Sequence, residues 1–244
     1  VLAPAITSGQ VDAFAEVVRR RQDREPLQYL LGHAAFRHLD LAVGPGVFIP
    51  RPETELLVDA VLPHLAAIAH PVVVDLCAGS GALGLAIATE CPAADVTVVE
   101  HSTDALAWLR GNVEALGGGR VRIVAGDVTD PHLLSDPAGL GALVARVDAV
   151  LSNPPYVPEG SRVDAEVDHD PPEAVFAGAD GLDLMPGIIA LAAALLRSGG
   201  RLALEHSETH GPALLEAFEP RSWRDVAGHE DLTARPRYVV ATKA

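Results

Sequence analysis

The sequence is poor in fixed positive charge. Its only lysine is Lys243, and its net charge is −15 at pH 7. A protein that binds duplex nucleic acid needs a basic face to neutralise phosphates. The short run Arg19-Arg20-Arg21 is interpreted as a solvated helix face. We therefore do not expect nucleic acid as the direct substrate, although a small local basic patch stays open as an alternative.

Cysteine and long apolar runs are scarce as well. Cys77 and Cys91 are the only cysteines, too few for a disulfide framework and without the Cys and His spacing of a zinc site. No stretch has the length and apolarity of a membrane span, and no signal peptide pattern opens the chain. We expect no metal and no membrane partner, and a location in the reducing cytoplasm.

The remaining composition is that of a globular enzyme. Of 244 residues, 49% are hydrophobic and 21% are charged, which is enough for one large domain with a sizeable core, or for one domain with a small appendage. Apolar runs and helical segments alternate from residue 71 onward. This order predicts parallel strands joined by right-handed crossovers.

The expected elements follow from hydrophobic periodicity and turn residues. Before residue 71 we expect helices over 11–22 and 26–32, a hairpin of strands 35–43 and 47–49, and a helix from 50 to about 69. Later strands are expected at 72–77, 95–100, 121–125, 147–152, 201–206, 222–228 and 236–242. Later helices are expected at 82–90, 103–116, 131–145, 184–198 and 210–218. The last two strands predict an antiparallel strand in the sheet.

A small-residue turn follows the first long strand. Residues 77–81 read Cys-Ala-Gly-Ser-Gly and lead into a helix. The glycines let the backbone approach a ligand, and free N–H groups at a helix start favour an electron-rich one. The dinucleotide fingerprint G-x-G-x-x-G is absent. Glu100 ends the second strand and could accept both hydroxyls of a ribose.

The strongest motif is Asn153-Pro154-Pro155-Tyr156, directly after the fourth strand. Asn153 offers an amide oxygen, the prolines stiffen the turn, and Tyr156 supplies a flat aromatic face. Such a group can hold a planar NH2. The alternative is a rigid turn with a packed tyrosine. Ligands of open α/β sheets lie at the carboxyl ends of the strands, so we expect residues 77–81, Glu100, Asp127 and Asn153 to surround one crevice.

With these motifs in hand, the chain resembles the protein-(glutamine-N5) methyltransferases, the PrmC/HemK family that modifies peptide-chain release factors. The matching segments are Glu25–Gly32, Gly46–Glu55 with its Arg-Pro-Glu-Thr-Glu sequence, the turn 74–81, Asn153–Tyr156 and Ala179–Asp183. The resemblance implies a Rossmann-like class I fold of the α/β type, with a mostly parallel seven-stranded sheet and an antiparallel C-terminal strand. It also implies S-adenosyl-L-methionine as cofactor and a translation release factor as protein partner.

The resemblance assigns candidate site residues. Those expected at the cofactor are Cys77, Ala78, Gly79, Ser80, Gly81, Glu100, His101, Asp127, Val128 and Asn153. Those expected to act on the substrate amide are Asn153, Pro154, Pro155 and Tyr156. Cys77 stands where many relatives have glycine, and Val128 where some have an aromatic residue.

The domain division is expected at residue 52. Family members carry an N-terminal domain of several helices, whereas the resemblance here begins near residue 25. Residues 1–52 are therefore expected to be a shortened helical and hairpin segment on the substrate side, and residues 53–244 the methyltransferase domain. Residues 48–55 are expected to form a wall beside the cofactor. The acidic loop 157–180 is expected to contact the substrate protein, with solvated disorder as the alternative.

Two other functions remain open. One is methylation of an exocyclic amino group of a nucleobase, because Asn-Pro-Pro-Tyr also occurs in adenine-N6 DNA methyltransferases. The other is a non-catalytic module that keeps the cofactor fold. Histidine is not expected to act as a base, and the four considered are interpreted as surface or core residues: His33, His38, His169 and His206.

Overall fold

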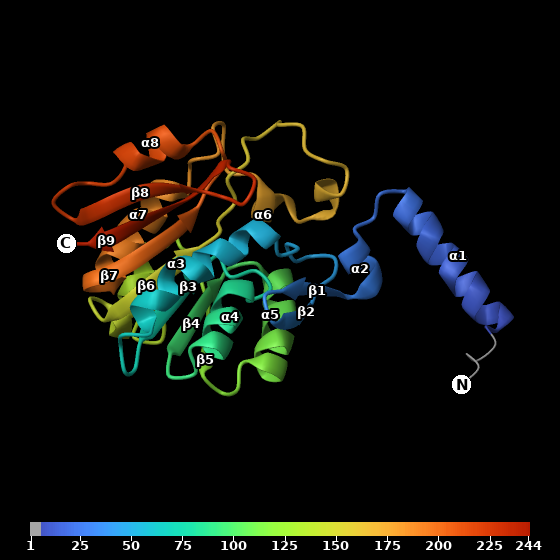
Figure 1. Ribbon diagram of the computed structural model, residues 1–244, viewed down its shortest axis with the longest axis horizontal. Helices are drawn as coiled ribbons and strands as arrows, with labels where there is room; N and C mark the ends of the chain where they lie inside the picture. Colours follow the sequence, from blue (N-terminus) through green and yellow to red (C-terminus); the bar gives the residue numbers. More distant parts are fainter. Residues whose placement is uncertain (1–5) are drawn as a thin grey trace.

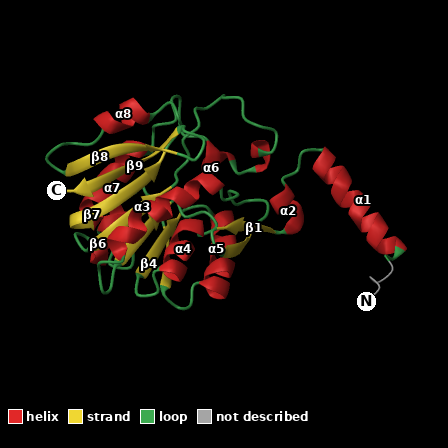
Figure 2. Ribbon diagram, in the orientation of Figure 1, coloured by secondary structure: helices red, strands yellow, loops and turns green. Residues whose placement is uncertain are grey.

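A seven-stranded sheet forms the centre of the molecule in the computed structural model, which describes residues 6–244 (Figure 1, Figure 2). Its strands are β3 (Val72–Leu76), β4 (Asp95–Glu100), β5 (Val121–Ala125), β6 (Val147–Ser152), β7 (Leu196–Glu205), β8 (Trp223–Glu230) and β9 (Pro236–Lys243). Their order is β5-β4-β3-β6-β7-β9-β8. β3 to β7 pair in parallel, whereas β9 runs antiparallel to β7 and to β8. The expected sheet is confirmed.

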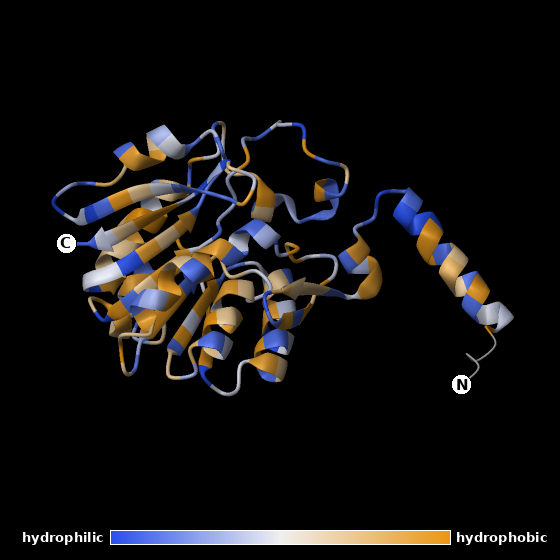
Figure 3. Ribbon diagram, viewed as in Figure 1, coloured by the Kyte–Doolittle hydropathy of each residue, from blue (hydrophilic) through white to orange (hydrophobic). Residues whose placement is uncertain are grey.

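Helices cover both faces of this sheet. α3 (Glu55–Leu65), α4 (Ala82–Glu90) and α5 (Thr103–Leu116) pack on one face, and α7 (Met185–Leu195) and α8 (Gly211–Glu216) on the other. Side chains of β3 alternate between the two cores, Val73 toward the first and Val74 toward the second. Because both faces are covered, the central strands are apolar along most of their length (Figure 3).

Residues 6–52 add helices and a hairpin beside the sheet. α1 (Ser8–Gln22) begins at a capping box of Thr7 and Gln10, projects away from the body and buries none of its residues (Figure 1). α2 (Leu27–Leu31) ends at Gly32, whose φ of 78° suits glycine. The hairpin strands are β1 (His33–Phe36) and β2 (Leu39–Ala42).

The hairpin shares its core with the sheet. Phe36, Leu41 and Ile49 are almost completely buried and belong to the same cluster as Leu57 of α3. No gap in packing therefore marks residue 52. The proposed segment 1–52 also includes residues 1–5, which lie outside the described part of the chain.

The prediction that residues 47–49 form the second strand of the hairpin was wrong. The chain turns earlier, at Arg37 and His38, so β1 pairs with β2. Arg37 has a φ of 49°; its N–H donates to Glu55 Oε1 at 2.7 Å, and its guanidinium donates to Glu90 Oε2 at 2.6 Å. These long-range contacts fix a turn that no glycine or proline announces.

The helix predicted over 131–145 was also wrong. Two short 3₁₀ segments, Pro131–Leu134 and Gly141–Leu143, occupy this region. A Cβ on Gly139 would lie 2.7 Å from the Leu133 carbonyl oxygen, so the chain folds back on itself more tightly than a helix permits. The apolar residues Leu133 and Leu140 of this region are buried in the core that contains α7, so their spacing reflects packing against the sheet and not helical periodicity.

The boundary between the helix predicted at 184–198 and the strand predicted at 201–206 lies earlier than expected. α7 ends at Leu195 and β7 begins at Leu196, with a register shift before Ala149 pairs with Arg201. The loop 157–180 contains two short helical segments, the 3₁₀ turn Val167–His169 and α6 (Pro172–Val175). Within residues 6–244, no helix is long and apolar enough to cross a membrane.

The contact between α4 and β4 can be tested at Gly84. A Cβ there would lie 2.3 Å from Val98 Cγ1. We expect Gly84→Ala to lower the free energy of unfolding by about 1–3 kcal/mol, since the helix must move away from the sheet. Chemical denaturation monitored by circular dichroism measures this.

The matched control is Gly111→Ala, also within a helix, where a Cβ meets nothing within 4 Å. It should leave stability unchanged or raise it by up to about 1 kcal/mol. Equal effects of the two substitutions would contradict the packing argument.

Candidate functional site

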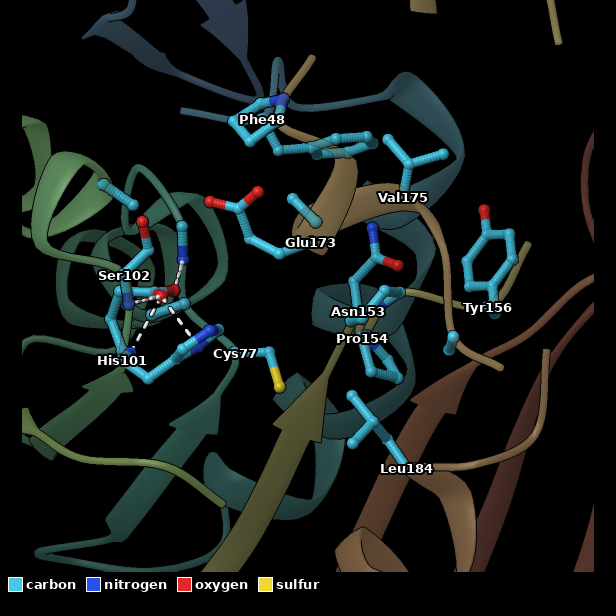
Figure 4. Close-up of a pocket in the computed structure, with 18 of the residues that line it drawn as sticks. Phe48, Cys77, His101, Ser102, Asn153, Pro154, Tyr156, Glu173, Val175 and Leu184 are labelled. Atoms are coloured by element: carbon cyan, nitrogen blue, oxygen red, sulfur yellow. Dashed lines mark hydrogen bonds and ion pairs between the residues drawn. The ribbon is translucent and has the colours of Figure 1, made fainter. Parts of the chain in front are cut away.

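A cavity of about 590 Å³ opens at the carboxyl ends of β3, β4 and β6 (Figure 4). β3 and β6 are neighbours in the sheet although they are distant in sequence, so this is the switch point where such folds bind ligands. Its volume lies in the range of small-molecule sites. Twelve of the expected site residues line it: Cys77, Ala78, Gly79, Ser80, Glu100, His101, Asp127, Val128, Asn153, Pro154, Pro155 and Tyr156.

The turn between β3 and α4 places backbone at the cavity wall. Cys77 has a φ of 61°, in the left-handed region that favours glycine. A Cβ on Gly79 would meet nothing within 4 Å, which leaves room for a ligand beside the backbone. Gly81, although expected at the site, does not line the cavity. Its φ of 89° and its approach to Leu109 make it a packing residue at the start of α4.

Glu100 is held in place by backbone N–H groups. Its Oε2 accepts from Gly79 at 2.8 Å, and its Oε1 accepts from His101 and Ser102, each at 2.8 Å. The side chain is almost fully buried at the end of β4. A carboxylate fixed in this way keeps an unused lone pair on Oε2, which can accept from a ligand hydroxyl.

Asp75 presents an unpartnered oxygen in the cavity wall. Its Oδ2 accepts from Gly84 N at 2.9 Å, while Oδ1 is buried without a hydrogen-bond partner among the described residues. Burial raises the pKa of Asp75 to about 7. A buried acceptor without a donor is costly, so this oxygen suits a ligand that brings an ammonium group or an N–H.

Asp127 lies on the far side of the cavity, after β5. Its Oδ1 accepts from the backbone N and the hydroxyl of Thr129, at 2.8 and 2.7 Å, and these bonds lower its pKa. The second oxygen is not used by Thr129. Asp127 therefore stays ionised and can accept a ligand N–H, while Val128 beside it offers an apolar face.

The tetrapeptide after β6 faces the same cavity (Figure 4). Asn153 Nδ2 donates to Thr54 Oγ1 at 3.0 Å, which leaves the amide oxygen of Asn153 available. The Tyr156 hydroxyl donates to Glu205 Oε1 at 3.0 Å. Burial and the charge of Glu205 raise the pKa of Tyr156, so its phenol stays neutral.

The segment from Phe48 to Thr54 forms the opposite wall. The Arg51 guanidinium lies 4.8 Å from the centre of the Phe48 ring and pairs with the buried carboxylate of Asp170. Asp170 also accepts from Ile49 N at 3.2 Å, and Tyr29 donates to Val47 O at 2.7 Å. One carboxylate of the acidic loop thus fixes the wall.

The arginine run on α1 is paired with acids. Arg19 contacts Glu16 and Asp23, Arg20 contacts Glu25, and Arg21 donates to Glu166 Oε1 at 2.7 Å. These ion pairs neutralise the three arginines, so little positive charge is left to bind a phosphate backbone. This agrees with the interpretation of the run as a solvated helix face.

Neither a disulfide nor a metal cluster occurs among residues 6–244. Burial raises the pKa of the Cys77 thiol, so it stays protonated. His33, His38 and His169 are exposed and His206 is buried. None of these four histidines lines the cavity.

Sequence reasoning did not single out four of the polar residues around the site. Asp75 and Thr54 line the cavity, and Glu205 and Asp170 lie behind it. A signal existed for Glu205, because it ends β7 as Glu100 ends β4. Asp170 carried no local signal, since its partner Arg51 lies more than a hundred residues away.

Comparisons with known proteins agree with this geometry. The model of the Methyltransferase small domain matches residues 38–219, and that of the PrmC N-terminal domain matches residues 3–32. The release factor glutamine methyltransferase of Mycolicibacterium smegmatis is 49% identical over 95% of this chain and 79% of its own length.

The chain is also similar to another curated methyltransferase and to a solved structure. The 4-amino-L-phenylalanine/4-methylamino-L-phenylalanine methyltransferase of Streptomyces pristinaespiralis is 39% identical over 84% of this chain and 70% of its own. The crystal structure of a predicted O-methyltransferase from Agrobacterium tumefaciens shares the fold, with a TM-score of 0.56, 24% identity and coverage of 79% of this chain and 81% of its own.

The role of Asp170 can be tested by Asp170→Ala. The substitution leaves Arg51 facing the wall without its buried partner and removes the acceptor for Ile49 N. We expect the free energy of unfolding to fall by about 3 kcal/mol in denaturation experiments.

The matched control is Glu166→Ala in the same loop, whose partly exposed pair with Arg21 should contribute less than about 1 kcal/mol. A loss for Asp170→Ala no larger than that of the control would contradict the assigned role.

Proposed function

Because the chain belongs to the release factor glutamine methyltransferase family, we infer that it methylates the side-chain amide nitrogen of a glutamine in a peptide-chain release factor. S-adenosylmethionine supplies the electrophilic methyl group. The observation that carries this inference is the single cavity shared by the Gly-rich turn, Glu100 and the Asn-Pro-Pro-Tyr segment. A donor site and an amide site therefore lie side by side.

We propose that the β3, β4 and β5 strand ends hold the methyl donor. Gly79 and its neighbours would border the methionine part, where Asp75 Oδ1 is available to the ammonium group. Glu100 would accept the ribose hydroxyls with its unused Oε2 lone pair. Asp127 would accept from the adenine amino group and Val128 would contact the adenine face.

The tetrapeptide would orient the substrate amide. An amide nitrogen is a weak nucleophile because its lone pair is delocalised into the carbonyl group. The free oxygen of Asn153 and the carbonyl of Pro154 would accept its two hydrogens, while Pro155 stiffens the turn and Tyr156 supports the amide plane. Acceptors on both N–H bonds raise the electron density on nitrogen, and alignment contributes several kcal/mol to the rate.

The bond changes balance without a metal or a covalent enzyme intermediate. The nitrogen–carbon bond forms while the carbon–sulfur bond breaks, and the electron pair of the broken bond stays on sulfur. The nitrogen then releases one proton to water. No residue has to act as a strong base before the methyl group has moved.

The same family assignment extends to the substrate side of the chain and to its location in the cell. We propose residues 1–52 and the loop 157–180 as the substrate side, because α1 and this loop meet through Arg21 and Glu166 and because Asp164 and Val167 of the loop line the cavity. We propose the cytoplasm as the location, since release factors act in translation and both cysteines are free.

A second candidate is methylation of an aryl amine, which the relative from Streptomyces pristinaespiralis favours. Its acceptor is also an NH2 group on a planar system, so the tetrapeptide alone does not separate the two. A nucleobase is less well supported, because the arginine run is neutralised by acids and the net charge is −15. A non-catalytic module would have no use for an Asn153 oxygen kept free at the cavity.

The function is tested by incubating the chain and S-adenosylmethionine with a purified release factor. Mass spectrometry should find one added methyl group on one glutamine, and replacing that glutamine by asparagine should abolish it. A parallel reaction with 4-amino-L-phenylalanine separates the second candidate. Methylation of the amino acid but not of the release factor would reverse the assignment.

Asn153→Ala tests the amide site. The variant should bind S-adenosylmethionine with an affinity within about twofold of the original, and lose at least about a hundredfold in kcat, because one of two acceptors on the reacting nitrogen is gone. Calorimetry and initial rates measure the two quantities. Unchanged turnover would remove Asn153 from the mechanism.

Glu100→Gln tests the donor site. Its side-chain NH2 would face backbone N–H groups that the carboxylate now accepts from. We expect affinity for S-adenosylmethionine to fall by about ten- to a hundredfold by calorimetry, as a charge-assisted acceptor is lost. The control is Glu114→Gln, an exposed carboxylate on α5 that does not line the cavity and should matter far less. Equal losses would argue against Glu100 as the ribose acceptor.

A further inference from the structure

A buried carboxyl lies directly behind the tetrapeptide. Glu205 ends β7 with 1% of its surface exposed and does not line the cavity. Its Oε1 accepts from the Tyr156 hydroxyl at 3.0 Å. Its Oε2 is buried and has no well-aligned donor among the described residues. The carboxyl therefore contacts one end of the tetrapeptide and keeps an oxygen for another donor.

Thr54 connects this carboxyl to the other end of the tetrapeptide. Its oxygen accepts from Asn153 Nδ2 at 3.0 Å, so its own proton must go to a different acceptor. Thr54 is 3% exposed, so its hydroxyl has little contact with solvent. The Thr54 hydroxyl is near enough to the Glu205 carboxyl to lower its pKa, while Glu205 Oε2 has no hydrogen-bond partner among the described residues and is free to accept this proton. The order of donors runs from Asn153 through Thr54 to the carboxyl.

We propose that Glu205 is a positioning residue for methyl transfer, acting through Thr54 to fix which way the Asn153 amide faces. The proposal rests on the function proposed above. With the Thr54 proton held by Glu205, only the NH2 end of Asn153 can meet Thr54, and the amide oxygen is left for the substrate. One carboxyl thus orients Asn153 and, through the phenol, Tyr156.

The alternative orientation shows why this matters. If the Thr54 proton pointed at Asn153, the asparagine oxygen would accept it and the NH2 end would face the substrate amide. Two NH2 groups would then oppose each other, and the substrate nitrogen would lose an acceptor. Asparagine carries no internal preference between these states, so a neighbouring group has to set it.

The groups around Glu205 make the orientation of the Asn153 amide sensitive to pH. Burial raises the pKa of Glu205 to about 7, Glu53 acts in the same direction, and Thr54, Tyr156 and Arg237 act to lower it. Above about pH 7 the carboxylate accepts from both hydroxyls. Below it the carboxyl can donate, which frees the Thr54 proton to turn toward Asn153.

The kinetic test compares two substitutions of Thr54. Thr54→Val keeps the shape and removes the hydroxyl, whereas Thr54→Ser keeps the hydroxyl. With a release factor as substrate, we expect Thr54→Val to lower kcat about tenfold or more, the effect of about one lost hydrogen bond. Its Kd for S-adenosylmethionine should stay within about twofold, and Thr54→Ser should retain kcat. Equal losses in both variants, or full turnover in Thr54→Val, would overturn the proposal.

A second readout needs no turnover. The chain has two asparagines, Asn112 and Asn153, so selective ¹⁵N labelling gives two side-chain NH2 signals. Asn112 is bound to backbone groups of Ala42 and Ser80 and serves as the internal control. We expect the Asn153 signal to titrate with a midpoint near pH 7, and Glu205→Gln to remove that titration.

The two readouts separate failure of this proposal from failure of the proposed function. If the release factor is not methylated by any variant but the Asn153 signal depends on Glu205 as expected, the positioning role stands and the substrate is wrong. An Asn153 signal that ignores pH, Thr54→Val and Glu205→Gln refutes the positioning role, whatever the turnover.

Discussion

The site depends on the convergence of parallel strand ends at one edge of the sheet. β3 and β6 are hydrogen-bonded neighbours, and β4 flanks β3 on the other side, so three loops distant in sequence open into one cavity. Glu100 is directed by three backbone N–H groups, and Asn153 is placed by the end of β6 and donates to the Thr54 side chain. The sheet therefore brings these groups together, and local contacts orient them.

Burial of acids is the cost of this arrangement, and each acid is compensated differently. Glu100 accepts three backbone N–H groups, and Asp170 has Arg51 as a partner. Asp75 and Glu205 each keep one unpartnered oxygen, and burial raises the pKa of both to about 7. The donors to Glu100 and Asp170 fix the direction of these carboxylates, whereas Asp75 and Glu205 each keep a whole oxygen for a donor from a ligand or a neighbour.

Sequence patterns predicted those features that local chemistry decides. The strand ends at Glu100 and Asn153 and the small-residue turn over 77–81 follow from short-range signals, and the cavity lies where parallel strands require it. Features decided by distant contacts were missed. The turn at Arg37 depends on acids of α3 and α4, and residues 131–145 are folded by packing beneath the sheet and not by their own periodicity.

The Arg-Pro-Glu-Thr segment shows why a motif can be recognised before its chemistry is understood. Arg51 pairs with the buried Asp170, whereas Thr54 accepts from Asn153, so two residues three positions apart connect this wall to the loop 157–180 and to the tetrapeptide. Pro52 begins the 3₁₀ turn that separates them and needs no N–H donor there. The spacing of Arg51 and Thr54 in the sequence therefore matters. Inserting or deleting one residue between them would break the Arg51–Asp170 pair or the Asn153–Thr54 hydrogen bond.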